Sequence, residues 1–163
     1  MTDLGQARAA VERSGARAWL LTAVRCLLGG LFVFAAVAKI LAPYDFAEVM
    51  ASYRILHEDV VFDASLVIVW QELFCGALLL LGFYTRAAAV IGSGMLAIFS
   101  LALLSAYARG LQMDCGCFGP LVESSISLGS LARTLALTAL SVLLACKGGG
   151  RWCLENAVLR EAS

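Results

Sequence analysis

The chain has 163 residues, of which 61% are hydrophobic and 15% are charged, and its formal net charge is zero. A mean hydropathy of +0.88 excludes an ordinary soluble domain, and the balanced charge argues against nucleic acid as a partner. Crossing the ~30 Å hydrocarbon core of a bilayer takes about 20 helical residues. We therefore expect an all-α integral membrane protein, built as a four-helix bundle in contact with membrane lipid.

The predicted spans account for most of the chain and leave no repeat, low-complexity tract or soluble domain. They are Ala18–Ala38, Ala64–Tyr84, Ala87–Tyr107 and Leu128–Cys146. Residues 18–146 thus form one transmembrane domain between an N-terminal segment (1–17) and a C-terminal tail (147–163). The small residues that permit close helix approach are Gly29, Gly30, Ala35, Gly76, Ala88 and Gly92. They predict a compact bundle. The turn between the second and third spans is only a few residues around Thr85-Arg86, so these two spans are expected to be antiparallel neighbours.

The N-terminal region has features of a cleavable signal peptide and of an uncleaved first helix. Its arginines precede an apolar run that ends in Ala36-Val37-Ala38. This run is longer than the ~7–15 residues of a signal core, and Arg25 interrupts it. An uncleaved first helix is therefore favoured.

Positive charge predicts the orientation in the membrane. With the N-terminus inside, the cytoplasmic side carries Arg8, Arg13, Arg17, Arg86, Lys147, Arg151 and Arg160. The outer loops then carry only Arg54 and Arg109, in agreement with the preference of basic residues for the cytoplasm. We expect a multi-pass protein of the inner (plasma) membrane with both termini cytoplasmic.

The first outer connection, Pro43–Asp63, is predicted to contain a short interfacial helix. Its apolar residues Phe46, Val49, Tyr53 and Leu56 recur near helical spacing beside charged neighbours. Such a helix would lie flat on the outer surface, where it could cover the turn after the third span or present a docking face. The alternative is an ordinary connector.

Four ionisable residues lie in or at the edge of the spans, where charge is costly and usually functional: Arg25, Lys39, Glu72 and Arg133. Lys39, Glu72 and Arg133 all fall in the outer half, and we assign them to the tuning of nearby thiols or to a quinone site. The structural alternative is a buried Glu72–Arg133 ion pair, with Lys39 snorkelling to the lipid headgroups. Arg25, in the inner half, would snorkel inward or pair with another group.

The connection between the third and fourth spans contains Asp114-Cys115-Gly116-Cys117-Phe118-Gly119-Pro120, which places two thiols one glycine apart on the outer side. A disulfide between them closes a small ring and is expected to be easily reduced. Cys115 is the expected exposed thiol and Cys117 the buried, resolving thiol. Two ligands of a structural metal are the alternative, but no further ligands follow at suitable spacing, so no metal site is predicted.

The other cysteines are expected to be unreactive. Cys26, Cys75 and Cys146 lie within the spans, where a cysteine is usually a small hydrophobic residue, and Cys153 lies in the cytoplasmic tail. An alternative hypothesis is that Cys75 relays electrons from the outer thiols, because it lies one turn inward of Glu72.

A family resemblance rests on residues from Arg25 to Leu144. Its elements are Arg25, Ala38-Lys39, the stretch 46–56 with Tyr53, Glu72-Leu73, the run 76–82, Gly110, the stretch 114–119 and Arg133. Together they resemble the MauE branch of the DoxX-like membrane proteins. The resemblance implies a four-span layout similar to that of quinone-linked disulfide-forming enzymes, and a role in maturing disulfide-rich periplasmic enzymes such as methylamine dehydrogenase.

Those quinone-linked enzymes carry a second, shuttle pair of cysteines, whereas here there is one outer pair. Cys115 and Cys117 would then exchange directly with a thioredoxin-like or disulfide-rich periplasmic protein through a mixed disulfide.

Three functions follow from these features. The leading hypothesis is a membrane thiol–disulfide oxidoreductase, or a subunit of one, in which Cys115 and Cys117 pass electrons between an extracytoplasmic thiol protein and a quinone. A second is an assembly factor without turnover, whose cysteines form a permanent disulfide. A third is a small transporter in which both thiols and Asp114 capture a soft metal ion. A homo-oligomer is compatible with each.

Overall fold

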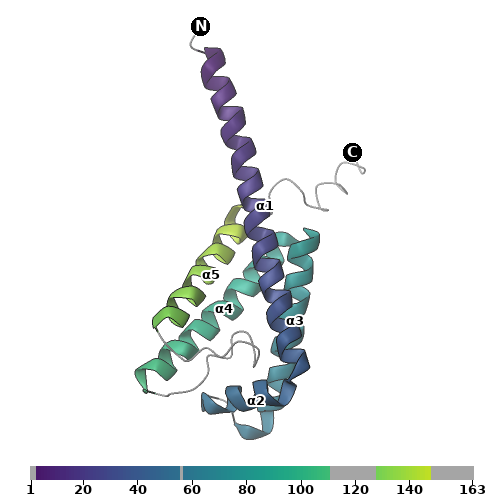
Figure 1. The fold of residues 1–163 in the computed structure, drawn as a ribbon, viewed down its shortest axis with the longest axis vertical. Helices are drawn as coiled ribbons and strands as arrows, with labels where there is room; N and C mark the ends of the chain where they lie inside the picture. Colours follow the sequence, from purple (N-terminus) through teal and green to yellow (C-terminus); the bar gives the residue numbers. More distant parts are fainter. Residues whose placement is uncertain (1–2, 56, 111–127, 148–163) are drawn as a thin grey trace.

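The computed structural model is all-helical over the residues that it describes, which are 3–55, 57–110 and 128–147, with side chains from residue 16 onward. Its helices are α1 (Asp3–Leu41), α2 (Pro43–Ser52), α3 (Glu58–Leu81), α4 (Thr85–Ala108) and α5 (Leu128–Lys147) (Figure 1). Four of them, all except α2, contain a segment long and apolar enough to cross a membrane. The predicted all-α fold, with a short helix between the first two spans, is confirmed.

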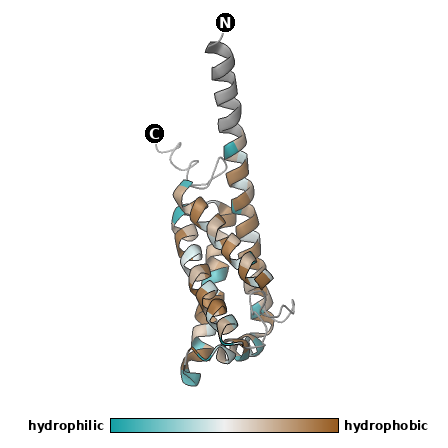
Figure 2. Cartoon of the chain, turned by 90° about the vertical axis from the view of Figure 1, so that its left-hand side faces the viewer, coloured by the Kyte–Doolittle hydropathy of each residue, from teal (hydrophilic) through white to brown (hydrophobic). Residues whose placement is uncertain are grey.

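The four long helices run alternately up and down, and α2 crosses one end of the bundle (Figure 1). We call this end the α2 end. The last residues of α4 and the first of α5 also lie there, whereas the N-terminus of α1 and the C-terminus of α5 lie toward the opposite end. Hydrophobic residues predominate along the bundle (Figure 2), and many large apolar side chains, such as those of Phe34, Phe74 and Ile98, face outward as expected in lipid.

The helix boundaries differ from the predicted spans where local backbone chemistry dominates over hydropathy. α3 begins at Glu58 rather than Ala64, because Glu58 and Asp59 in its first turn complement the helix dipole. It ends at Leu81, since Gly82 takes a left-handed conformation with φ 69°. The Phe83 amide donates to the Leu78 carbonyl at 3.1 Å, and the Gly82 amide to that of Leu79 at 3.2 Å, which is a Schellman motif. α4 follows at once, so α3 and α4 are antiparallel, as predicted.

α1 and α3 approach closely through two glycines. A Cβ on Gly29 would lie 3.0 Å from the carbonyl oxygen of Gly76, and a Cβ on Gly76 would lie 2.9 Å from the amide nitrogen of Val33. The predicted role of these small residues in packing is therefore confirmed. Gly30 is different, because a Cβ there would meet nothing within 4 Å, and its predicted role in packing is wrong.

α4 and α5 form the second closely packed pair. The buried Ser141 hydroxyl of α5 donates to the Ala89 carbonyl of α4 at 3.0 Å. Gly92 of α4 also lets this pair approach α1 closely, since a Cβ at this position would lie 3.2 Å from the Phe32 ring of α1.

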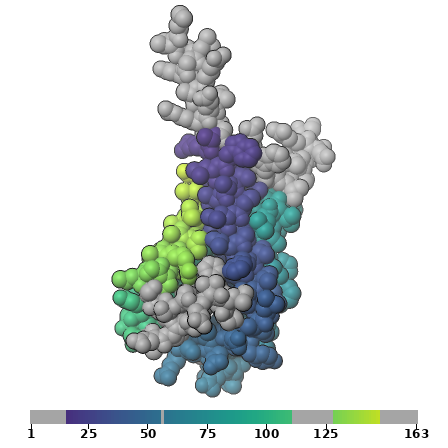
Figure 3. Space-filling view, viewed as in Figure 1, coloured from purple at the N-terminus to yellow at the C-terminus, as the bar shows by residue number. Residues whose placement is uncertain are grey.

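The two helix pairs meet at the end opposite α2 and diverge toward the α2 end (Figure 1). One buried cluster contains Leu28, Phe32, Leu79, Ala88, Ala89 and Leu144, and its members on α3, α4 and α5 come from the halves of those helices nearer that opposite end. In the space-filling view α1 runs down the front face beside α5 (Figure 3). The space between the pairs at the α2 end holds a pocket.

Candidate functional site: an intramembrane pocket

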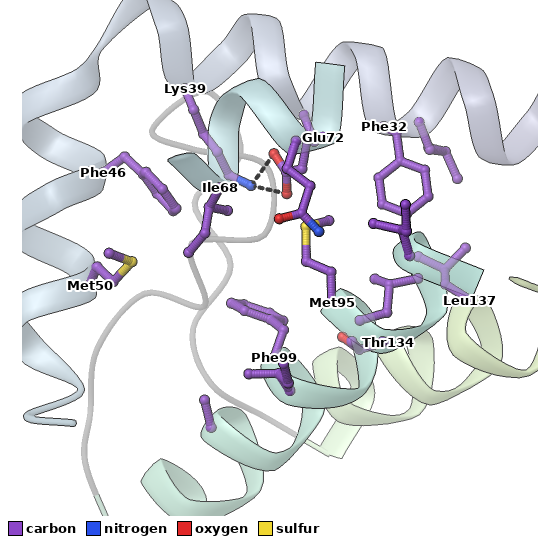
Figure 4. Close-up of a pocket in the computed structure, with 18 of the residues that line it drawn as sticks. Phe32, Lys39, Phe46, Met50, Ile68, Glu72, Met95, Phe99, Thr134 and Leu137 are labelled. Atoms are coloured by element: carbon purple, nitrogen blue, oxygen red, sulfur yellow. Dashed lines mark hydrogen bonds and ion pairs between the residues drawn. The ribbon is translucent and has the colours of Figure 1, made fainter. Parts of the chain in front are cut away.

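The pocket lies between the two helix pairs, is bounded by α2, and has a volume of about 570 Å³. Side chains of all five helices line it, among them Phe32 of α1, Phe46 and Met50 of α2, Met95 and Phe99 of α4, and Leu137 of α5 (Figure 4). Ligand sites in proteins typically occupy about 300–1,000 Å³ and combine apolar walls with a few polar groups. The pocket has the size and the character of such a site.

Lys39 and Glu72 form a buried ion pair in the wall of this pocket. The Lys39 ammonium group donates to Oε1 of Glu72 at 2.6 Å and to Oε2 at 2.7 Å (Figure 4). Both residues are largely removed from solvent, with 3% of Lys39 and 7% of Glu72 exposed. The snorkelling alternative for Lys39 is therefore wrong, and the ion-pair partner of Glu72 is Lys39 rather than Arg133.

Arg133 reaches the same pocket from α5, together with Thr134. The Thr134 hydroxyl donates to the Ser130 carbonyl at 2.8 Å, one helical turn earlier, so it is satisfied within its own helix. Lys39, Glu72 and Arg133, which the sequence places on three different spans, thus line one pocket. Their convergence was predicted from depth alone, and the roles assigned to them stay predictions.

α2 closes the pocket at its end and is held there by contacts at both of its ends. Near its start, the Lys39 ammonium group lies 4.8 Å from the centre of the Phe46 ring, a cation–π geometry. At its other end, the Arg109 guanidinium donates to the Tyr53 carbonyl at 2.6 Å. The Tyr53 ring also contacts the Phe99 ring edge-on, with centroids 6.3 Å apart. The interfacial helix predicted from the sequence exists, and its apolar face packs on the pocket.

Some functional candidates lie elsewhere. Arg25 is 3% exposed, so it does not snorkel to the surface. Cys75 is buried in α3, while Cys26 and Cys146 are exposed on the spans. Cys115 and Cys117, with the rest of 111–127, lie outside the described residues, as does Cys153.

Sequence reasoning missed Gln71, which also lines the pocket beside Glu72. An uncharged amide within an otherwise apolar span is a weaker signal of a functional site than an ionisable side chain. Sequence reasoning also missed the aromatic and Met residues of the pocket wall, because the sequence does not distinguish a large apolar side chain that faces lipid from one that lies in the core.

Comparison with known proteins gives one consistent result. A family model described as methylamine utilisation protein MauE matches residues 17–147. The chain is 32% identical over 127 residues to the methylamine utilization protein MauE of Paracoccus denitrificans, which covers 77% of this chain and 68% of that protein. It is 31% identical over 143 residues to the protein of the same description from Paracoccus versutus, covering 84% of this chain and 77% of the relative. No solved structure matches significantly.

Proposed function

The chain belongs to the family of methylamine utilisation protein MauE and is a multi-pass membrane protein, and on this premise we propose that it is a membrane thiol–disulfide oxidoreductase or a subunit of one. Its Cys115 and Cys117 exchange electrons between an extracytoplasmic thiol protein and a lipid-soluble quinone. The observation that carries the proposal is the pocket with buried charges in a membrane domain whose sequence also carries a Cys-Gly-Cys segment.

The pocket fits a quinone in its chemistry. A quinone has an apolar ring and tail but two carbonyl oxygens, so it needs apolar walls with a few hydrogen-bond donors. Phe32, Phe46 and Phe99 supply aromatic wall, while Lys39 and Gln71 supply N–H donors. Charged groups buried in a membrane domain are costly, and their presence at a ligand pocket supports a functional role.

The chain topology also supports the proposal. In the described chain, α4 ends and α5 begins at the α2 end, and residues 111–127 lie between them in the sequence (Figure 1). Lys39, the last basic residue of α1, lies toward the same end. The two helix ends that flank the Cys-Gly-Cys segment in the sequence thus lie at the end of the bundle at which the pocket lies, and we propose that electrons pass between this segment and the pocket without crossing the membrane.

The reaction that we propose balances without a further reactant. Two electrons and two protons leave the Cys115 and Cys117 thiols as the S–S bond forms, and the same electrons and protons convert a quinone to a quinol. The disulfide then exchanges with a dithiol of the partner through a mixed disulfide, which returns Cys115 and Cys117 to thiols. Lys39 and Glu72 would line the quinone site, and Arg133 would favour the thiolate form of a nearby cysteine.

The orientation in this proposal follows the charge pattern. Both termini are cytoplasmic, and α2 and the cysteines face the periplasm or exterior, because basic residues concentrate at the opposite end. The relatives are described as methylamine utilization proteins, so we propose that the client is a disulfide-rich extracytoplasmic enzyme of methylamine use, reached directly or through a thioredoxin-like protein.

The test is a redox titration of the Cys115–Cys117 pair in purified protein in lipid nanodiscs. The pair is equilibrated with dithiol and disulfide buffers and trapped by thiol alkylation, with and without added quinone, and the Cys115→Ser, Cys117→Ser double variant serves as the control. We expect a reversible midpoint and oxidation of the pair by quinone. A pair that never closes, or that closes and cannot be reduced, would refute the proposal. It would favour the soft-metal transporter or the assembly factor without turnover.

A further inference from the structure

Among the residues that the structure describes, the exposed lining residues of the pocket come mainly from one helix, α4. Most of its lining residues from α1, α2, α3 and α5 are buried or half-buried, including Leu28, Phe32 and Ala35 of α1. The exposed lining residues are Val90, Ile91, Gly94 and Ile98 of α4 and Ile55 after α2. Ile98 is 71% exposed and Ile91 is 48% exposed. The opening of the pocket is therefore edged by α4.

The helix on the other side of this opening is α3. The two helices are joined by the turn at Gly82–Tyr84 and diverge from there toward the α2 end (Figure 1). Ile68 and Gln71 of α3 line the pocket and are half-buried. Glu58–Leu81 and Thr85–Ala108 are both long and apolar enough to cross a membrane, so an opening of the pocket between them would face the hydrocarbon of the bilayer.

We propose that this gap is a lateral portal, defined by Ile68 and Gln71 of α3 and by Ile91, Gly94 and Ile98 of α4, through which an isoprenoid quinone enters from the bilayer. This inference rests on the proposed function for the class of ligand. The ring lies inside, against Lys39 and Glu72, and the isoprenoid tail crosses Gly94 into lipid. The rim of the gap is apolar and faces lipid, which suits an isoprenoid tail that is itself soluble in lipid. The charged groups lie inside the pocket, where they suit the ring carbonyls.

Gly94 is the residue that keeps the portal open. A Cβ at this position would meet nothing within 4 Å, so its lack of a side chain is not required by helix packing. Gly30 on α1 is equally unhindered, is also exposed, and does not line the pocket. The two glycines thus form a matched pair in which one borders the portal and the other does not.

The experiment compares Gly94→Leu with Gly30→Leu in lipid nanodiscs, using ubiquinone-10 labelled with tritium. We expect Gly94→Leu to weaken binding at least about tenfold, and Gly30→Leu to leave it within about twofold, because only the first substitution fills the portal. Both variants are expected to fold, as judged by an unchanged thermal midpoint. Should Gly94→Leu fail to fold, Gly94→Ala replaces it, with an expected weakening of about threefold.

A second measurement locates the tail directly. A quinone with a photoreactive group in its tail is bound to the unmodified protein and cross-linked, and the labelled peptides are mapped by mass spectrometry. Labels on residues 91–98 and 67–71 are expected, and labels confined to α1 and α5 would overturn the portal. Equal binding by both leucine variants overturns the portal alone. No binding by the unmodified protein overturns the quinone site of the proposed function and the portal together.

Discussion

Lys39 at the end of α1 and Glu72 in the middle of α3 share a bidentate ion pair, with the ammonium nitrogen 2.6 and 2.7 Å from the two carboxylate oxygens. The pair joins the two helices that also meet at Gly29 and Gly76. It lies in the pocket wall, so it both joins the two helices and borders the pocket. A buried pair of this kind contributes little net stability against apolar residues, but either member left alone is a buried, uncompensated charge.

Removing one member of the pair should lower the free energy of unfolding more than removing both members. We expect Lys39→Met to lower the free energy of unfolding by about 3–5 kcal/mol, because the Glu72 carboxylate loses its partner. The Lys39→Met, Glu72→Met double variant should recover most of this loss. Denaturant titration of the purified protein in detergent measures both. If the double variant loses the sum of the two single losses, the side chains act independently and the interpretation fails.

The Gly29–Gly76 contact predicts that single methyl groups disrupt the bundle. Gly29→Ala and Gly76→Ala should each lower the free energy of unfolding by about 1–3 kcal/mol, because the added Cβ meets backbone atoms of the neighbouring helix. Gly30→Ala is the matched control and should be neutral or slightly stabilising, since its Cβ would enter open space. Equal effects at Gly29 and Gly30, measured in the same titration, would contradict this packing.

Arg109 is predicted to hold α2 on the end of the bundle. Arg109→Gln removes the guanidinium that donates to the Tyr53 carbonyl, so amide hydrogen exchange in α2 should rise about fivefold to tenfold, equivalent to about 1 kcal/mol. The comparison is Arg86→Gln, an exposed arginine at the start of α4, which should leave exchange in α2 unchanged. Exchange is read by mass spectrometry, and no difference between the two variants would show that the Arg109–Tyr53 hydrogen bond does not hold α2 in place.

Cys115 and Cys117 are each predicted to be necessary for disulfide exchange, but their Ser variants should block different steps of it. Cys115→Ser should abolish mixed-disulfide formation with the partner, whereas Cys117→Ser should trap it, because the resolving thiol is missing. Gel mobility under non-reducing conditions detects the trapped complex. Cys26→Ser, on an exposed face of α1, should behave as the unmodified protein. Trapping by Cys115→Ser instead would reverse the two assignments.

Arg133 offers a test of how the pocket and the thiols communicate. Arg133→Gln should slow alkylation of the more reactive outer cysteine about threefold to tenfold at neutral pH, because a nearby cation favours thiolate. Arg133→Lys keeps the charge and should retain most of the rate. A merely structural role would affect the thermal midpoint of both variants and leave the ratio of their alkylation rates near one.

The sequence predicted much of this architecture because its signals are local and strong. Twenty-residue apolar stretches have few alternatives to spanning helices, and the short connection predicted around Thr85-Arg86 requires the two helices that it joins to be antiparallel. The structure has this turn slightly earlier, between Leu81 of α3 and Thr85 of α4. The helical spacing of Phe46, Val49 and Tyr53 was enough to predict α2. The depth of Lys39, Glu72 and Arg133 along their spans was enough to predict that they gather in one half of the bundle.

What the sequence by itself determined is therefore the number of spans, their order and the level of each polar residue in the membrane. Only the tertiary structure decided that Glu72 pairs with Lys39, that Gly29 packs while Gly30 does not, and that the helix pairs separate to leave a pocket open beside Gly94. The physical reason is that depth depends on position along one helix. Partner choice depends on the rotation of each helix about its axis and on the angle between pairs, which are set by contacts between residues far apart in the chain.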